Sequence, residues 1–164
     1  KPPIADGPLS GRDVWIISDG KAGHELQMLG IAEALGAVPV IRRIPEPGRL
    51  YKLTAPHCPP PRSLRPGHPG SPFNAPWPAL AMATGRLTMP YIRTLKKAAG
   101  LTTYTVILLD PKTGPNTADL FWVPEHDARR GPNVVTTLTS PHRYTPARLE
   151  ALRAQLPPEI AALP

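Results

Sequence analysis

The sequence predicts an α/β fold, a Rossmann-like, doubly wound parallel sheet of about six strands. Short apolar runs of strand length alternate with stretches of helical spacing, which is typical of parallel sheets with crossover connections. One run, "TYTVILLD", is continuously hydrophobic, as in strands that are buried on both faces. The chain has 164 residues, which is enough for one such domain with a core of its own.

Six segments have the character of strands. The first, "DVWIIS" (13–18), is a short apolar run with β-branched residues and a tryptophan. The second, "VPVIRRI" (38–44), is expected near an edge of the sheet because Pro39 cannot donate to a ladder. The remaining strands are expected at 79–84, 103–110, 119–124 and 133–138.

Three segments have the character of helices. Residues 24–35 carry leucines at helical spacing and end before Gly36, a favourable C-cap. Residues 86–99 form the next helix, although Pro90 either kinks it or moves its regular part later in the chain. Residues 145–156 form an amphipathic helix that begins with a threonine N-cap and a proline at the first helical position.

Eleven of the 25 prolines of the chain lie between residues 45 and 78. This stretch has too little apolar periodicity for an element of its own, so we predict a long extended loop, partly polyproline and more disordered than functional. The loop is inserted in a domain that spans 13–156. Residues 1–12 are expected to be a flexible leader, and 157–164 a linker to a second domain that is absent.

Charge and cysteine content limit the partners and the compartment. The net charge is +7, but the basic residues come in scattered pairs without interleaved aromatic side chains. This pattern favours an anionic ligand over nucleic acid and leaves contact with an anionic membrane surface open. A single cysteine, Cys58, suits a reducing compartment such as the cytoplasm. No apolar run approaches the ~20 residues of a membrane span. The chain starts without methionine, so a targeting segment stays open.

Polar motifs follow four of the predicted strands. "SDGKAGHE" follows the first strand, "TGRLT" the third, "DPK" the fourth and "PEHD" the fifth. Ligands of open parallel sheets bind at the carboxyl ends of the strands, beside the switch in strand order. The sequence therefore predicts a binding site at this edge of the sheet.

Two of these motifs combine glycine with a cation, as anion sites do. Gly20 and Gly23 allow close approach of the backbone, Lys21 adds a charge, and the following helix offers free N–H groups. The second motif offers the glycine Gly85, the guanidinium of Arg86 and the hydroxyls of Thr84 and Thr88. Together the two motifs suit a diphosphate or another extended anion. Neither matches a P-loop or a dinucleotide fingerprint, so no cofactor is expected.

Each motif also has a structural interpretation. The glycines can serve a tight strand-to-helix turn, and a histidine such as His24 near a helix start is more often a cap or a surface residue. Asp110 before a proline is a common way to end a strand. Residues 125–127, "EHD", contain metal-ligand types, but neighbours in sequence rarely face one ion, so no metal is expected. Residues 130–134 suit a turn before the last strand.

The motifs taken together resemble a known family. "ISDGKAGHELQMLGIAEAL", "ATGRLTMP", "LLDP", "VPEHD" and "RGPNVVTTLTSPHRYTP", in this order, are similar to the "elongated mitochondria" family of plant mitochondrial-fission proteins and their bacterial relatives. The similarity runs from about residue 13 to residue 156, with the proline-rich stretch unmatched, and the composition is closer to the bacterial members. The family resembles two-domain GT-B glycosyltransferases, which implies that this chain is the amino-terminal, acceptor-side half.

The resemblance also implies site residues. Its ligand-binding positions are Asp19, Gly20, Lys21, Gly23, Thr84, Gly85, Arg86, Thr88 and His126. Its catalytic positions are His24, Asp110 and Glu125, with His24 as general base. Two departures, Leu26 in place of a polar residue and Leu87 in place of a second arginine, weaken the match to the family pattern.

Two functions from different classes are compatible with these features. In the first, the chain is half of a sugar transferase and shares a nucleotide-sugar or a phosphorylated acceptor with a second domain, so that alone it binds weakly and is inactive. In the second, the chain is a non-catalytic adaptor that recruits a partner through the proline-rich loop. We favour the first because an adaptor has no need of polar clusters at one sheet edge, although a fold alone cannot decide.

Overall fold

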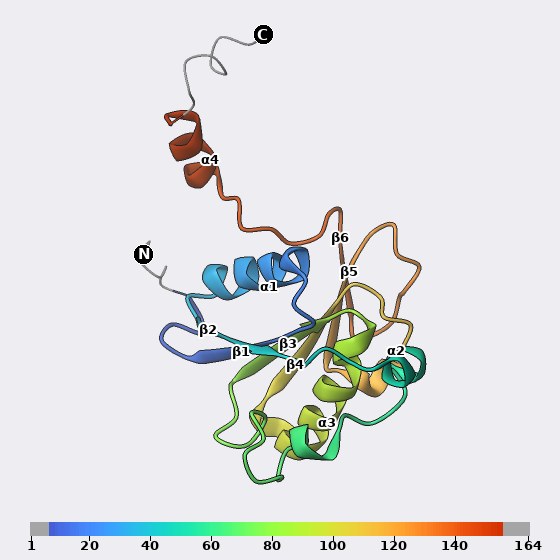
Figure 1. Ribbon diagram of the computed structural model, residues 1–164. Helices are drawn as coiled ribbons and strands as arrows, with labels where there is room; N and C mark the ends of the chain where they lie inside the picture. Colours follow the sequence, from blue (N-terminus) through green and yellow to red (C-terminus); the bar gives the residue numbers. More distant parts are fainter. Residues whose placement is uncertain (1–6, 156–164) are drawn as a thin grey trace.

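The computed structural model describes residues 7–155 (Figure 1). Within them, six parallel strands form one sheet in the order β2-β1-β3-β4-β5-β6. The strands are β1 (Asp13–Ser18), β2 (Val38–Arg43), β3 (Leu80–Thr84), β4 (Tyr104–Leu108), β5 (Leu120–Pro124) and β6 (Val134–Thr137). The predicted α/β, Rossmann-like fold is confirmed. The strand with Pro39 lies at an edge, as predicted.

The described helices are α1 (Ala22–Ala34), α2 (Arg49–Thr54), α3 (Met89–Ala99) and α4 (Pro146–Arg153). Helices α1 and α3 lie on opposite faces of the sheet (Figure 1). Helix α3 begins later than the predicted residue 86, because residues 86–88 form a 3₁₀ turn and Pro90 occupies the first turn of the α-helix. Pro90 has no N–H to donate, and the first turn is where none is needed.

Each face of the sheet has its own apolar cluster. On one face Met28 and Ala32 of α1 cover Val14 and Ile16 of β1, and all four are fully buried. On the other face α3 packs its buried side chains, including Ile92 and Leu95, over Ile17, Ile107 and Phe121. The two layers of helix around one sheet position the strand ends at a common edge.

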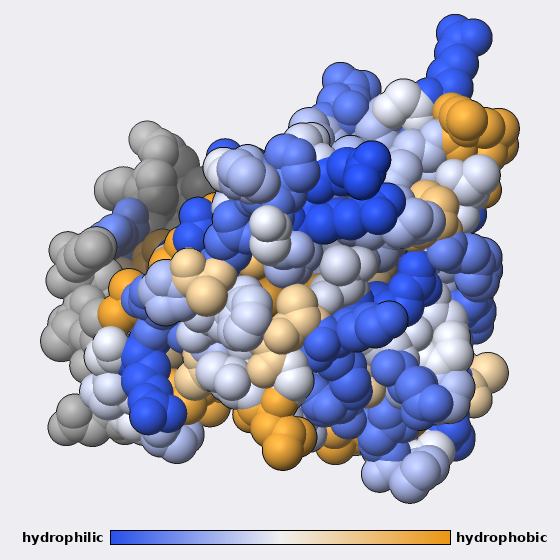
Figure 2. Space-filling model, turned by 90° about the horizontal axis from the view of Figure 1, so that it is seen from below, coloured by the Kyte–Doolittle hydropathy of each residue, from blue (hydrophilic) through white to orange (hydrophobic). Residues whose placement is uncertain are grey.

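The proline-rich segment is not the disordered loop that its composition predicts. It contains helix α2 and a 3₁₀ turn, and Phe73 is 2% exposed, in edge contact with Trp15 and 5.4 Å between ring centroids from Tyr91. Arginines of the following elements donate to its carbonyl groups, Arg93 to His57 and Cys58 among them. The segment is therefore held in place by a few contacts, such as the buried Phe73 ring and the arginine hydrogen bonds, and not by a regular pattern of apolar residues. The face on this side is mostly hydrophilic, with apolar side chains in separate small groups (Figure 2).

The two ends of the described chain differ in packing. Residues 7–12 form a turn whose Leu9 N–H donates to the Leu35 carbonyl, 3.0 Å away, after the end of α1. Thr145 caps α4 by accepting from the Arg148 N–H, as predicted, yet no residue of α4 is buried. The rest of the predicted leader and the predicted linker at 157–164 lie outside the described residues. No helix in the described part of the chain has the length and apolarity needed to cross a membrane.

Candidate functional site

The direction in which strands are added to the sheet reverses between β1 and β3, and the region beyond the carboxyl ends of these two strands is called the crevice below. From β1 the chain passes to β2 on one side and returns to β3 on the other, so this pair flanks the topological switch point where open sheets bind ligands. Gly85 follows β3 with φ of 83°. A Cβ atom at Gly85 would lie 3.1 Å from His24 Cε1 and 3.4 Å from Asp19 Oδ2. The His24 and Asp19 side chains therefore pack directly over Gly85, where a side chain would not fit without a shift of its neighbours.

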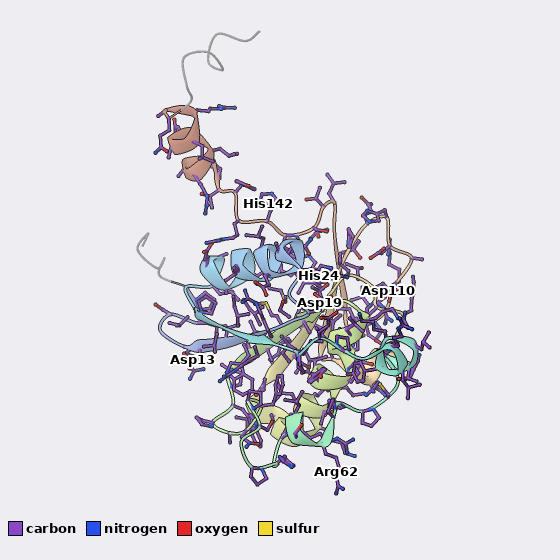
Figure 3. All side chains as sticks on the ribbon, in the orientation of Figure 1. Asp13, Asp19, His24, Arg62, Asp110 and His142 are labelled. Carbon is purple, nitrogen blue, oxygen red and sulfur yellow. The ribbon has the colours of Figure 1, made fainter. Side chains whose placement is uncertain are left out.

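Asp19 and His24 form a pair at the mouth of this crevice (Figure 3). The His24 Nδ1 and Asp19 Oδ1 atoms are 3.1 Å apart, and the side chains are 21% and 3% exposed. Burial alone would raise the Asp19 pKa, but the hydrogen bond and charge of His24, with Lys21 nearby, hold that pKa below its ordinary value. With Asp19 accepting from Nδ1–H, a neutral ring keeps Nε2 as an acceptor. This arrangement can orient a general base.

A second network lies under the same loop. Glu25 accepts a hydrogen bond of 2.7 Å from the Ser18 hydroxyl and two from the Arg43 guanidinium, 2.8 and 2.9 Å long. The Arg43 bonds, with Ser18 assisting against burial, lower the Glu25 pKa to about 2. Ser18 Oγ also accepts from the Gly20 N–H at 2.9 Å. The network fixes both ends of the loop that carries Asp19.

Ser18 and Arg43 were not predicted as site residues. What identifies them is the pairing of β1 with β2, which places Ser18 opposite Arg43 in the sheet. That register follows only once the strands are paired, so a search for motifs along the chain does not find it. Gly23, by contrast, was named and lies in open space at the start of α1.

The motif after β3 contributes less to the crevice than predicted. The Thr84 hydroxyl donates to the Leu108 carbonyl at 3.0 Å, and the Thr88 hydroxyl donates to the Thr84 carbonyl at 2.8 Å, both buried within the fold. Arg86 donates through Nη2 to the carbonyl of Ala55 and so ties this edge to the proline-rich segment. The side chains of Thr84, Arg86 and Thr88 are thus bonded to backbone carbonyl groups of the fold, whereas Gly85 lies against His24.

The residues after β4 and β5 lie apart from the Asp19–His24 pair. Asp110, labelled in Figure 3, is paired with Lys112 and Arg129 at 2.8 Å each. Burial raises the Asp110 pKa, but these two cations outweigh it and lower the pKa to about 2. Glu125 and His126 are exposed. No hydrogen bond within residues 7–155 joins any of the three to His24. The same residues contain no group of three ligand side chains placed to hold a metal.

A protein-family model described as "Mitochondrial fission ELM1" matches residues 22–164. The chain belongs to this family. The ELM1 match begins at α1, so it includes His24 and Gly85, whereas Asp19, Gly20 and Lys21 precede it. No curated protein and no solved structure matches the chain.

Proposed function

We propose that this ELM1-family chain is the acceptor-side, amino-terminal domain of a GT-B-like glycosyltransferase. The observation that carries the proposal is the Asp19–His24 pair beside Gly85, at the switch point of the sheet. A histidine oriented by a carboxylate in an open crevice is the arrangement that enzymes use to activate a hydroxyl. Glycine at position 85 lets the His24 ring and the Asp19 carboxylate pack against the end of β3, which fixes the position of the ring.

In this mechanism His24 Nε2 removes the proton of the acceptor hydroxyl as its oxygen attacks the anomeric carbon of a nucleotide-sugar. The bond from that carbon to the nucleotide diphosphate breaks, and the diphosphate leaves with the electron pair. Asp19 holds the ring and stabilises the charge that forms on it. Asp110 takes no part as a base, because a carboxylate with a pKa of about 2 is weakly basic at neutral pH.

The phosphate of an acceptor or donor would be held at the start of α1. Lys21 is 67% exposed, and its Nζ lies 3.4 Å from Asp19 Oδ2. Lys21 is also the N-cap residue of α1, and its side chain makes no capping hydrogen bond to the N–H groups of the first turn. Helix N-termini bind phosphate through such groups.

In this proposal a second domain supplies most contacts to the nucleotide-sugar, and the protein is a bacterial, cytoplasmic member of the family. The net charge of +7 supports contact with an anionic membrane surface, and the scattered placement of the basic residues without interleaved aromatic side chains argues against nucleic-acid binding.

Ligand-observed NMR with the 164-residue chain tests the proposal, using a panel of nucleotides, sugar phosphates and pyrophosphate. We expect saturable binding that Lys21→Ala weakens by roughly tenfold, or about 1.4 kcal/mol. Lys97→Ala, an exposed lysine on α3, is the matched control and should bind as the wild type does. Gly85→Ala should also weaken binding, because its Cβ would occupy the space beside His24.

Two results would count against the transferase domain. One is the absence of binding by the whole panel at millimolar concentration. The other is equal binding by Lys21→Ala, Gly85→Ala and the wild type. Either result would leave recruitment of a protein partner as the alternative. That alternative must then use a surface other than the buried part of the proline-rich segment around Phe73.

A further inference from the structure

A second hollow lies on the outer side of α1, away from the contact between His24 and Gly85. It has a volume of about 430 Å³, within the range of small-molecule sites. One wall is the α1 face that carries Gly23, Leu26 and Gln27, and the other is the segment 139–148 that leads from β6 into α4. Figure 3 shows His142 of this segment beside α1.

The segment is fastened to α1 at the far end of the hollow. A Cβ atom at Gly30 would lie 2.7 Å from the His142 carbonyl oxygen, so glycine is what lets the segment approach the helix. One turn on, Arg143 forms a two-pronged ion pair with Glu33, with Nε and Oε2 2.9 Å apart. These contacts hold one end closed, whereas between Gly23 and segment 139–148 the two walls separate.

The lining of the hollow has one sign of charge. Its charged members are Arg148 and Arg143, and no carboxylate lines it; His142 Nδ1 accepts a hydrogen bond from the Tyr144 N–H. Arg143 is neutralised by Glu33, but Arg148 makes no ion pair within residues 7–155; its guanidinium lies 5.9 Å from the centre of the Tyr144 ring. A cation of this kind at a pocket wall is complementary to an anionic group.

The rest of the lining is apolar or able to form hydrogen bonds. Leu26, Pro141 and the Tyr144 ring offer apolar contact, and Ser140 offers a hydroxyl. The Gln27 Oε1 atom is buried and has no hydrogen-bond donor in the described part of the chain. A buried polar atom without a partner costs free energy, and rotation of this side chain toward a ligand O–H or N–H would recover it.

We propose that this pocket binds a small phosphate monoester with an aromatic or apolar body. Arg148, with His142 beside it, holds the phosphate, and Leu26, Pro141 and Tyr144 contact the body. The pocket contains neither His24 nor Gly85, so it does not depend on the transferase proposal, although Gly23 at its edge belongs to the first turn of α1. A mostly apolar pocket with a few convergent polar groups is the usual form of a small-molecule site.

The test is NMR titration of the isotope-labelled 164-residue chain with phenyl phosphate, compared with inorganic phosphate and phenol. Phenyl phosphate should bind saturably and at least tenfold more tightly than either fragment, and it should shift the amide signals of Leu26, Ser140 and Tyr144. Leu26→Asp places a carboxylate in the pocket and should weaken binding by tenfold or more. Leu26 is 47% exposed, so the fold tolerates the change.

Leu50→Asp is the matched control, since Leu50 is 74% exposed on α2 and lies outside the pocket. A second pair, Arg148→Gln against Arg153→Gln, makes the same comparison for charge on α4. Equal binding of phenol or inorganic phosphate, or equal loss in Leu26→Asp and Leu50→Asp, would overturn the proposal. Shifts confined to His24 and Gly85 would also overturn it and would instead support the crevice. Gly85→Ala should leave binding here unchanged, which separates the failure of one proposal from the failure of the other.

Discussion

The proline-rich segment 45–78 and the carboxy-terminal segment 139–155 show opposite relations between sequence pattern and packing. The first has little periodicity, yet it buries Phe73 and Ala55 in the core beside α3. The second contains a properly capped helix with leucines at helical spacing, yet Leu149 and Leu152 are both nearly half exposed. Local pattern therefore decides which element forms, and a few large anchors decide whether it packs.

The anchors of the two segments differ in kind. In the proline-rich segment an aromatic side chain enters the core, and arginines from outside satisfy the carbonyl groups that the prolines leave without partners. In the carboxy-terminal segment the described anchors are the close approach at Gly30 and the pair of Arg143 with Glu33, both on the surface of α1. Apolar burial stabilises far more than a surface ion pair.

The largest expected effect is that of Phe73→Ala, which should lower the free energy of unfolding by about 3–5 kcal/mol through the cavity that it leaves. Urea denaturation measures it. Leu152→Ala on α4 is the control and should change stability by less than about 0.5 kcal/mol. If the two variants cost the same, the proline-rich segment is not part of the core and the comparison fails.

Alkaline pH should loosen the proline-rich segment before the rest of the fold. Burial, with Tyr91 and Cys58 nearby, raises the pKa of Tyr51 above its ordinary value. A raised pKa favours the neutral phenol in the folded state, so its contribution to stability is complete below pH ~10 and is lost as pH rises beyond that value. Tyr51→Phe should reduce the decline in unfolding free energy above pH ~10.

At neutral pH the same Tyr51→Phe variant should differ from the wild type by less than about 1 kcal/mol, because the Tyr51 hydroxyl lies near Tyr91 but makes no hydrogen bond of good geometry within residues 7–155. Denaturation followed at several pH values makes the measurement. Burial raises the Tyr91 pKa as well, so a remaining decline in the variant is expected. An unchanged decline would contradict the role assigned to Tyr51.

Arg93→Ala should have a smaller effect, about 1 kcal/mol, since it removes hydrogen bonds to the carbonyl groups of His57 and Cys58 at a partly exposed position. Hydrogen exchange should show faster opening of residues around 55–60 with little change in β1. Arg153→Ala on α4 supplies the matched control. Equal exchange in both variants would show that the arginine does not hold the segment.

Of these variants, Gly30→Ala should have the smallest effect on the free energy of unfolding. It should instead loosen the contact between the carboxy-terminal segment and α1. Alanine favours the helix by about 1 kcal/mol, but its Cβ would displace the His142 carbonyl. Limited trypsin cleavage after Arg143, Arg148 and Arg153 should become faster. Gly23→Ala on the same helix meets no neighbour and serves as the control. Unchanged cleavage in Gly30→Ala would show that the close approach does not hold the segment.

The sheet was predictable from the sequence because its strands are short, apolar and separated by clear breaks. "DVWIIS" and "ALAMAT" appear as β1 and β3 within one residue, and the motif after β1 reaches the crevice as the carboxyl-end rule predicts. The order of the strands, by contrast, depends on pairing across the sheet. That pairing alone brings Gly85 to His24.

The roles of the polar side chains were less predictable than their location. Asp110 and Arg86 were named for their type, yet each is engaged by a partner far along the chain, Arg129 and Ala55 respectively. Asp19 is the opposite case, because its partner His24 is five residues away and could be recognised from the start of α1. A single sequence indicates hydrogen-bond and ion-pair partners that are close along the chain, but not those that only the fold brings together.

The strand order has a consequence for how the protein is made. Of the six described strands, β1 leaves the ribosome first, and it pairs with β2 on one side and β3 on the other. Each later strand then joins the free edge left by the one before it, so no strand has to insert between two that have already paired. A nascent chain can extend this sheet from one nucleus as synthesis proceeds, with one open edge to protect at the growing side.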